Sequence, residues 1–129
     1  MSKTGNQRQI DALLHEAVAL QQNGALAEAQ ELYHEILAQR PRHFDALQLL
    51  GALALQAGRP AEGAEWLAKA LAINSREAPV HSNLAFALNA LQQHDAALAA
   101  ANRALALKPN FADALNNRGT ALAALDRPL

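Results

Sequence analysis

The sequence repeats itself with a period of 34 residues, and this period constrains the fold more than any other feature. Gly51, Ala85 and Gly119 are spaced by that interval (85 − 51 and 119 − 85). The segment Asp-Ala-Leu-Gln-Leu-Leu-Gly at 45–51 returns as Asp-Ala-Leu-Asn-Asn-Arg-Gly at 113–119. A fixed period of this length is typical of stacked supersecondary units rather than of one closed globule. Such arrays usually bind partners along a surface and seldom carry out chemistry in a pocket.

Composition excludes several classes of function. The 129 residues carry a net charge of −1, so the chain lacks the basic face that nucleic-acid binding requires. No uninterrupted apolar stretch approaches the length of about 18 residues that indicates a membrane span. Residues 1–9 are polar, and we predict that they form a tail rather than a signal peptide. The chain contains no cysteine, which is compatible with the cytoplasmic location that we expect.

Each period contains two helical patterns separated by a turn. Leu13, Ala17 and Leu20 illustrate the helical spacing of one apolar face. Gly24 and Gly58 end such patterns, because glycine readily takes the left-handed conformation of a helix end. The patterns predict an all-α fold of about seven helices, at about 9–22, 26–40, 43–56, 60–73, 78–91, 94–107 and 111–125. We expect one domain over residues 10–129, with repeats at about 10–43, 44–77 and 78–111 and a partial fourth at 112–129.

Small residues recur inside the predicted helices, where two helices must approach closely. A helical glycine costs about 1 kcal/mol relative to alanine. The recurrence of glycine at Gly51 and Gly119 therefore predicts that packing requires it. Trp66 and His81 are predicted to pack at helix interfaces, the tryptophan between adjacent repeats and half-buried.

The repeated residues resemble the tetratricopeptide repeat over about residues 10–129. The match rests on these residues: Leu47, Leu50, Gly51, Leu84, Ala85, Ala97, Ala104 and Pro109. Ser75 departs from the pattern, because proline is expected there. The resemblance implies a right-handed superhelix of antiparallel helix pairs. It also implies that the first helix of each pair lines a concave groove that binds extended peptides or partner helices.

Residues of the first helices that packing does not use are the candidates for this groove. One part is apolar and the rest carries amides, and we predict a peptide-binding groove formed by Leu14, Val18, Gln48, Leu49, Leu55, Asn83, Phe86 and Asn117. Asn83 and Asn117 are one period apart, and an amide can pair with a peptide backbone of any sequence. The pair resembles the asparagine ladder in the repeat region of O-linked N-acetylglucosamine transferases. The alternative is that both are ordinary solvated residues of a helix surface.

Other kinds of site are not indicated by the sequence. The five histidines show no spacing that would gather a metal site, so we predict no bound metal or other cofactor. No serine or threonine is accompanied by a base, and no pair of carboxylates suggests acid–base chemistry, so we predict no catalytic residue. Asp45 and Asp113 lie where a groove that clamps a terminal carboxylate would need basic residues, and we therefore expect no such clamp.

Three functions remain open at this point. The first is a non-catalytic scaffold for protein–protein interaction that binds an extended peptide or a partner helix. The second is the substrate-recruiting arm of a larger enzyme, such as a glycosyltransferase, and the third is a structural spacer or self-assembly module. The pattern at about 111–125 lacks its partner helix. We therefore expect the chain to be a piece of a longer array whose exposed end can self-associate.

Overall fold

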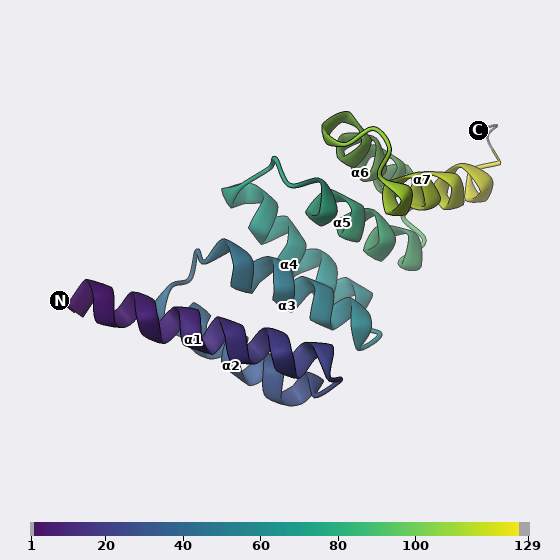
Figure 1. The fold of residues 1–129 in the computed structure, drawn as a ribbon. Helices are drawn as coiled ribbons and strands as arrows, with labels where there is room; N and C mark the ends of the chain where they lie inside the picture. The colour runs from purple at the N-terminus through teal and green to yellow at the C-terminus, as the bar shows by residue number, and fades with distance from the viewer. Residues whose placement is uncertain (1, 127–129) are drawn as a thin grey trace.

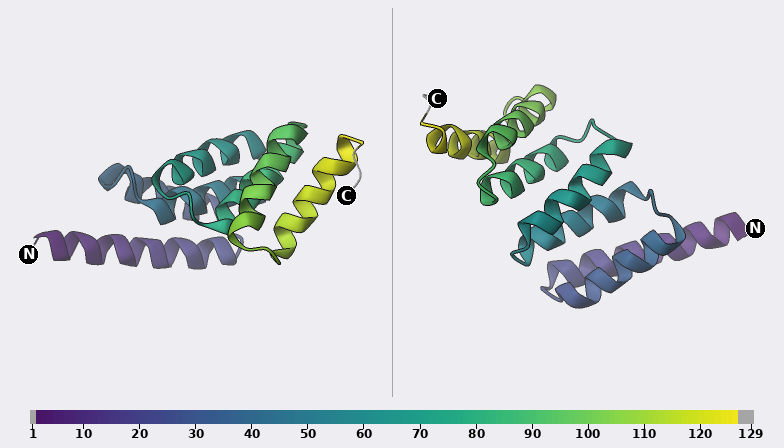
Figure 2. Two further views of the ribbon diagram at one scale, coloured as in Figure 1. Left: turned by 90° about the horizontal axis from the view of Figure 1, so that it is seen from above. Right: turned by 180° about the vertical axis from the view of Figure 1, so that it is seen from behind.

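The computed structural model describes residues 2–126, with side chains from Gly5 onward. Over this range the chain forms seven α-helices and no strand: α1 (Ser2–Gln22), α2 (Leu26–Gln39), α3 (Phe44–Gln56), α4 (Pro60–Ile73), α5 (Ala78–Ala90), α6 (His94–Leu107) and α7 (Ala112–Ala124). Figure 1 shows consecutive helices running antiparallel and stacking pair beside pair. Seen from behind in Figure 2, α2, α4 and α6 lie in front of the first helices of their pairs. The predicted all-α superhelical array is therefore confirmed.

The first helix is longer than the sequence indicates. Residues 2–9, predicted as a polar tail, belong to α1. Two contacts hold this segment: the Arg40 Nη1 atom donates to Gln7 Oε1 at 2.7 Å, and Gln7 Nε2 donates to Asp11 Oδ1 at 2.8 Å. Ile10 is fully buried directly after it. One of these contacts comes from Arg40, directly after α2, and a local sequence pattern does not contain it.

The turn inside each helix pair closes with a residue in the left-handed region. Gly24 has φ of 84° and Gly58 has φ of 78°, as the predicted helix stops require. Gln92 occupies the same place in the third repeat with φ of 64°, although it has a side chain. The repeat geometry therefore imposes this turn even where glycine is absent.

Close packing explains one of the two recurrent glycines. A Cβ atom built on Gly51 would lie 2.7 Å from Leu67 Cγ and 3.3 Å from the Gly63 carbonyl oxygen, so α3 and α4 meet in direct contact there. Gly119 has nothing within 4 Å of such an atom among the described residues. The expectation that packing requires glycine is confirmed at Gly51 and is wrong at Gly119.

The core consists of clusters that run along the array. Trp66 is half-buried and packs against two of them, one built around Tyr33 and one built around Leu67, which confirms its predicted place between repeats. His81 is 6% exposed, and its Nε2 atom donates to the Ser75 carbonyl oxygen at 2.9 Å. The imidazole thus anchors the loop that leads into α5, at the packed position predicted for it.

A chain of hydrogen bonds connects the first two repeats through Tyr33. The Tyr33 hydroxyl donates to Gln21 Oε1 at 2.6 Å, and Gln21 Nε2 donates to Gln56 Oε1 at 3.3 Å. Tyr33 itself is fully buried. Burial raises the pKa of Tyr33 from 10.0 to about 12, because the phenolate would lose its hydration.

We therefore expect the hydroxyl of Tyr33 to ionise at a higher pH in the folded chain, near 12, than in the unfolded chain, near 10. A pKa that is raised on folding stabilises the native state below pH 10, and this stabilisation is lost as the pH rises from 10 to about 12. The chain has a single tyrosine, so the near-ultraviolet absorbance of tyrosinate reports this group alone. A native titration midpoint near the ordinary value would contradict the burial argument. The urea-unfolded chain provides the reference curve.

Candidate functional site

A groove with a volume of about 770 Å³ lies on the face formed by α3, α5 and α7. These are the first helices of three successive pairs, which is where the repeat architecture expects a concave surface. Its lining consists mostly of small apolar, amide and hydroxyl side chains: Ala52, Leu55, Gln56, Ser82, Asn83, Phe86, Asn89, Ala90, Asp113, Asn116, Asn117 and Thr120. We call this feature the central groove.

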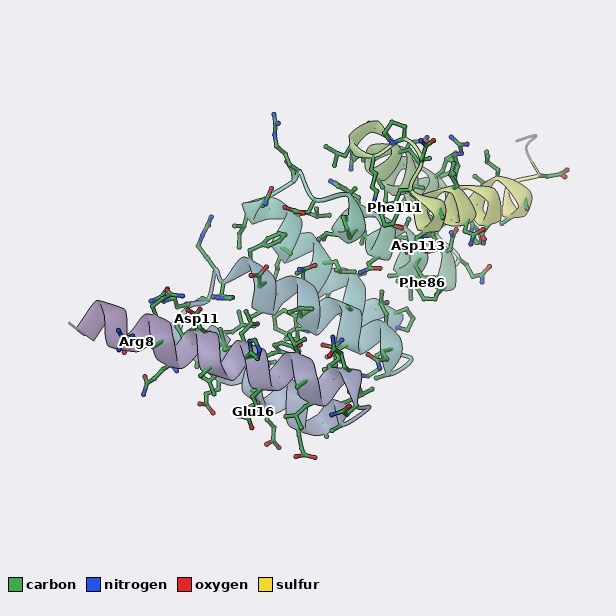
Figure 3. The ribbon with its side chains drawn as sticks, in the orientation of Figure 1. Arg8, Asp11, Glu16, Phe86, Phe111 and Asp113 are labelled. Atoms are coloured by element: carbon green, nitrogen blue, oxygen red, sulfur yellow. The ribbon has the colours of Figure 1, made fainter. Side chains whose placement is uncertain are left out.

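Phe86 provides the main apolar surface of the central groove. It projects from α5 (Figure 3) with 53% of its surface exposed, and Leu55 of α3 lies half-buried in the same groove. Leaving an aromatic side chain in water forgoes much of the roughly 1.5–3 kcal/mol that its burial would contribute. A large exposed apolar side chain inside a hollow with a polar rim is typical of a binding surface.

Asn83 and Asn117 differ in what their amides do. Asn117 Nδ2 donates to the Ser82 carbonyl oxygen at 2.9 Å and to Ser82 Oγ at 3.1 Å, so it ties α7 to α5. The side-chain amide of Asn83, half-buried on α5, makes no hydrogen bond within residues 5–126. The two asparagines share a register position, but only the Asn83 amide has both its donors and its acceptor free.

Asn89 is a polar residue of the central groove that is almost fully buried. It is 7% exposed, its Nδ2 atom donates to the Asn117 carbonyl oxygen at 3.0 Å, and its Oδ1 atom lies 2.8 Å from His94 Nδ1. The signal in the sequence is the register, since Gln21 stands two periods earlier and also forms a bond between repeats.

The predicted groove residues do not all share one hollow. Leu55, Asn83, Phe86 and Asn117 line the central groove. Leu14 and Val18 line a separate hollow of about 530 Å³ whose lining comes from α1 alone. Gln48 and Leu49 line neither of them.

Packing explains why the surface is interrupted between these two hollows. Leu49 lies one period before Asn83, but it packs against the core cluster that contains Ile10 and Leu50. Its side chain is half-buried against this cluster, so only part of it remains on the surface. A sequence register assigns equivalent positions to one face, but it does not determine which of them line a common hollow.

Charge in the central groove is confined to one residue. Asp113, exposed in the first turn of α7, is the single charged side chain of the lining, and no lysine or arginine accompanies it. Within the described part of the chain, no three histidine, aspartate or glutamate side chains gather as metal ligands. No described helix is long and apolar enough to cross a bilayer. The groove thus offers apolar contact, amides and one carboxylate.

The last helix that the structure describes, α7, carries an exposed apolar side chain. Leu115 of α7 is 41% exposed, whereas Leu47, the equivalent residue of α3, is 2% exposed. The difference arises because α4 covers α3, and no described helix covers α7 in the same way. This is the face for which we predict self-association, and that prediction stays open.

Comparison with known proteins gives both family and structural matches. A profile described as tetratricopeptide repeat matches residues 20–85, and a second of the same description matches residues 78–111. A mutant of the Thermobaculum terrenum O-GlcNAc transferase is similar at 30% identity and a TM-score of 0.85, over 91% of this chain and 22% of that one. A search of curated proteins found no significant sequence match.

Two further structures share the fold. The MamA protein is 23% identical with a TM-score of 0.85, over 90% of this chain and 63% of that one. The first TPR of Spaghetti (RPAP3), bound to the HSP90 peptide SRMEEVD, is 21% identical with a TM-score of 0.88, over 92% of this chain and 94% of that one. The chain therefore spans about a fifth of the transferase and under two thirds of MamA.

Proposed function

The chain belongs to the tetratricopeptide repeat family, and we propose that it binds an extended peptide of a partner protein in the central groove. Such repeats generally act as scaffolds for protein–protein interaction, and we propose a non-catalytic role of that kind. The observation that carries the proposal is the exposed Phe86 beside the unpaired amide of Asn83 in one hollow.

Phe86 and Asn83 would contact different parts of the peptide. Phe86 and Leu55 would cover an apolar side chain of the peptide and exclude water from it, which supplies affinity. Asn83 would donate to a peptide carbonyl and accept from a peptide N–H, which fixes the backbone regardless of sequence. Asn117 would act indirectly, because its bonds to Ser82 hold α7 against α5 and set the width of the groove.

A random linear peptide library displayed on phage would test this proposal. We expect the native chain to enrich peptides that share an apolar residue. Phe86→Ala should lower the affinity for the enriched peptides by about tenfold or more, as the loss of a buried aromatic anchor does. Asn83→Ala should lower this affinity by about fivefold, which corresponds to the loss of one hydrogen bond.

Leu107→Ala is the matched control, because Leu107 is 44% exposed and lies outside the central groove. Its truncation removes a similarly exposed apolar side chain and should leave peptide affinity unchanged. Circular dichroism of all variants monitors helicity. Equal affinity of a well-folded Phe86→Ala variant, or a library that yields no enriched peptide, would sink the proposal.

The similarity to the transferase favours a second candidate function. Because this chain matches 22% of that protein at 30% identity, we propose as the alternative that it is the substrate-recruiting arm of a larger enzyme of that kind. The central groove would then bind the polypeptide to be modified. Sequencing the gene on both sides of this segment would test it, since the candidate requires a nucleotide-sugar-binding domain in the same reading frame.

A further inference from the structure

We infer that the peptide held in the central groove carries a lysine or arginine close to its apolar anchor; this inference rests on the proposed function. The observation is the charge of the lining, in which Asp113 is the single ionised side chain. Phe86 and Asp113 line the same groove from neighbouring first helices, α5 and α7 (Figure 3). An apolar anchor on Phe86 would thus bring the adjoining peptide residue near a carboxylate.

The carboxylate of Asp113 is available for such a contact. It makes no ion pair or hydrogen bond within residues 5–126. Its place in the first turn of α7 puts it beside the positive end of the helix dipole, which amounts to about half an elementary charge. The full negative charge of Asp113 exceeds this half charge, so the α7 side of the groove remains negative.

Nearby basic residues do not neutralise the groove. Lys108 precedes α7, but its Nζ atom lies 4.8 Å from the centroid of the Phe111 ring and it does not line the groove. Arg118 belongs to α7 and is also absent from the lining. Asp45, two periods before Asp113, adds a second exposed carboxylate at the equivalent place on α3.

The negative charge of Asp113 distinguishes the central groove from a groove that binds acidic peptides. The peptide bound to the first TPR of Spaghetti has the sequence SRMEEVD, in which three carboxylate side chains outnumber one arginine, so the segment is acidic overall. A groove with one carboxylate and no cation in its lining would repel such a segment. The carboxylate would attract a cationic segment, and more strongly at low than at high ionic strength.

The test compares amino-acid frequencies in the phage peptides that different variants enrich. With the native chain at low salt, we expect lysine and arginine to be enriched over aspartate and glutamate by about threefold, as a largely exposed ion pair provides. Asp113→Asn should abolish this bias while still enriching peptides with the apolar anchor. Asp126→Asn is the matched control, because Asp126 follows α7 outside the groove and its neutralisation should keep the bias.

Synthetic peptides give a second readout. We expect SRMEEVD to bind the native chain more weakly than the same peptide with its three acidic residues replaced by lysine, and Asp113→Asn to reduce that difference. Enriched peptides with no charge bias, or with the same bias in Asp113→Asn, would overturn this inference and leave the proposed function standing. A library that yields no enriched peptide with the native chain would overturn both.

Discussion

Replacing Gly51 by alanine is expected to lower the free energy of unfolding by about 1–2 kcal/mol, whereas the same change at Gly119 should raise it by about 1 kcal/mol. The two glycines occupy the same register position, two periods apart, in the middle of α3 and α7. Alanine has a higher helix propensity than glycine, so propensity alone predicts that both substitutions stabilise the fold. At Gly51 the new methyl group would meet Leu67 Cγ at 2.7 Å, and Leu67 is fully buried and has little room to move.

Urea unfolding of both variants, followed by circular dichroism, measures the two free energies. The paired design removes the effect of helix propensity, because the same substitution is made at equivalent sites of two helices. Opposite signs would support the contact argument. Stabilisation at both positions would show that α4 can withdraw from α3 at no cost, and the close approach of these helices would then not be a requirement of the fold.

The period and the helix-breaking residues were enough to predict most of the fold. The predicted helix at 60–73 coincides with α4 (Pro60–Ile73), because Pro60 and Gly58 act locally on the helix start and the preceding turn. The start of α1 could not be predicted in this way. Its first residues are polar, and a hydrogen bond from Arg40, 33 residues along the chain, helps to hold them in the helix.

The candidate site was predictable as a face but not residue by residue. The register places Asn83 and Asn117 on equivalent positions, and both do line the central groove. Their different hydrogen bonding depends on the neighbouring helix: the Asn117 amide reaches the Ser82 backbone and hydroxyl, whereas Gln48 stands one period before Ser82 and makes no such bond with Asn83. Contacts of this kind depend on the distance between two helices, and a single sequence does not record that distance.

Truncating Leu67 to alanine is expected to cost about 3 kcal/mol of unfolding free energy, the largest effect that we predict for one substitution. Leu67 is fully buried in a cluster with Leu47, Ala70 and Val80, and its removal leaves a cavity between α3 and α4. The third repeat packs different residues at the same two register positions. Ala85 and Ala101 occupy the positions that Gly51 and Leu67 occupy in the second repeat. Both alanines are fully buried in one cluster.

This natural pair predicts how Gly51→Ala and Leu67→Ala combine. With the leucine gone, the methyl group of Gly51→Ala no longer meets Leu67 Cγ, and alanine gains its helix propensity of about 1 kcal/mol. We therefore expect Gly51→Ala to destabilise the native chain but to stabilise the Leu67→Ala chain, a coupling of about 2–3 kcal/mol. A double-mutant cycle from urea unfolding measures it. If Gly51→Ala costs the same in both backgrounds, the obstacle is the Gly63 carbonyl oxygen, 3.3 Å from where the new Cβ atom would lie, and the leucine is not what makes glycine necessary.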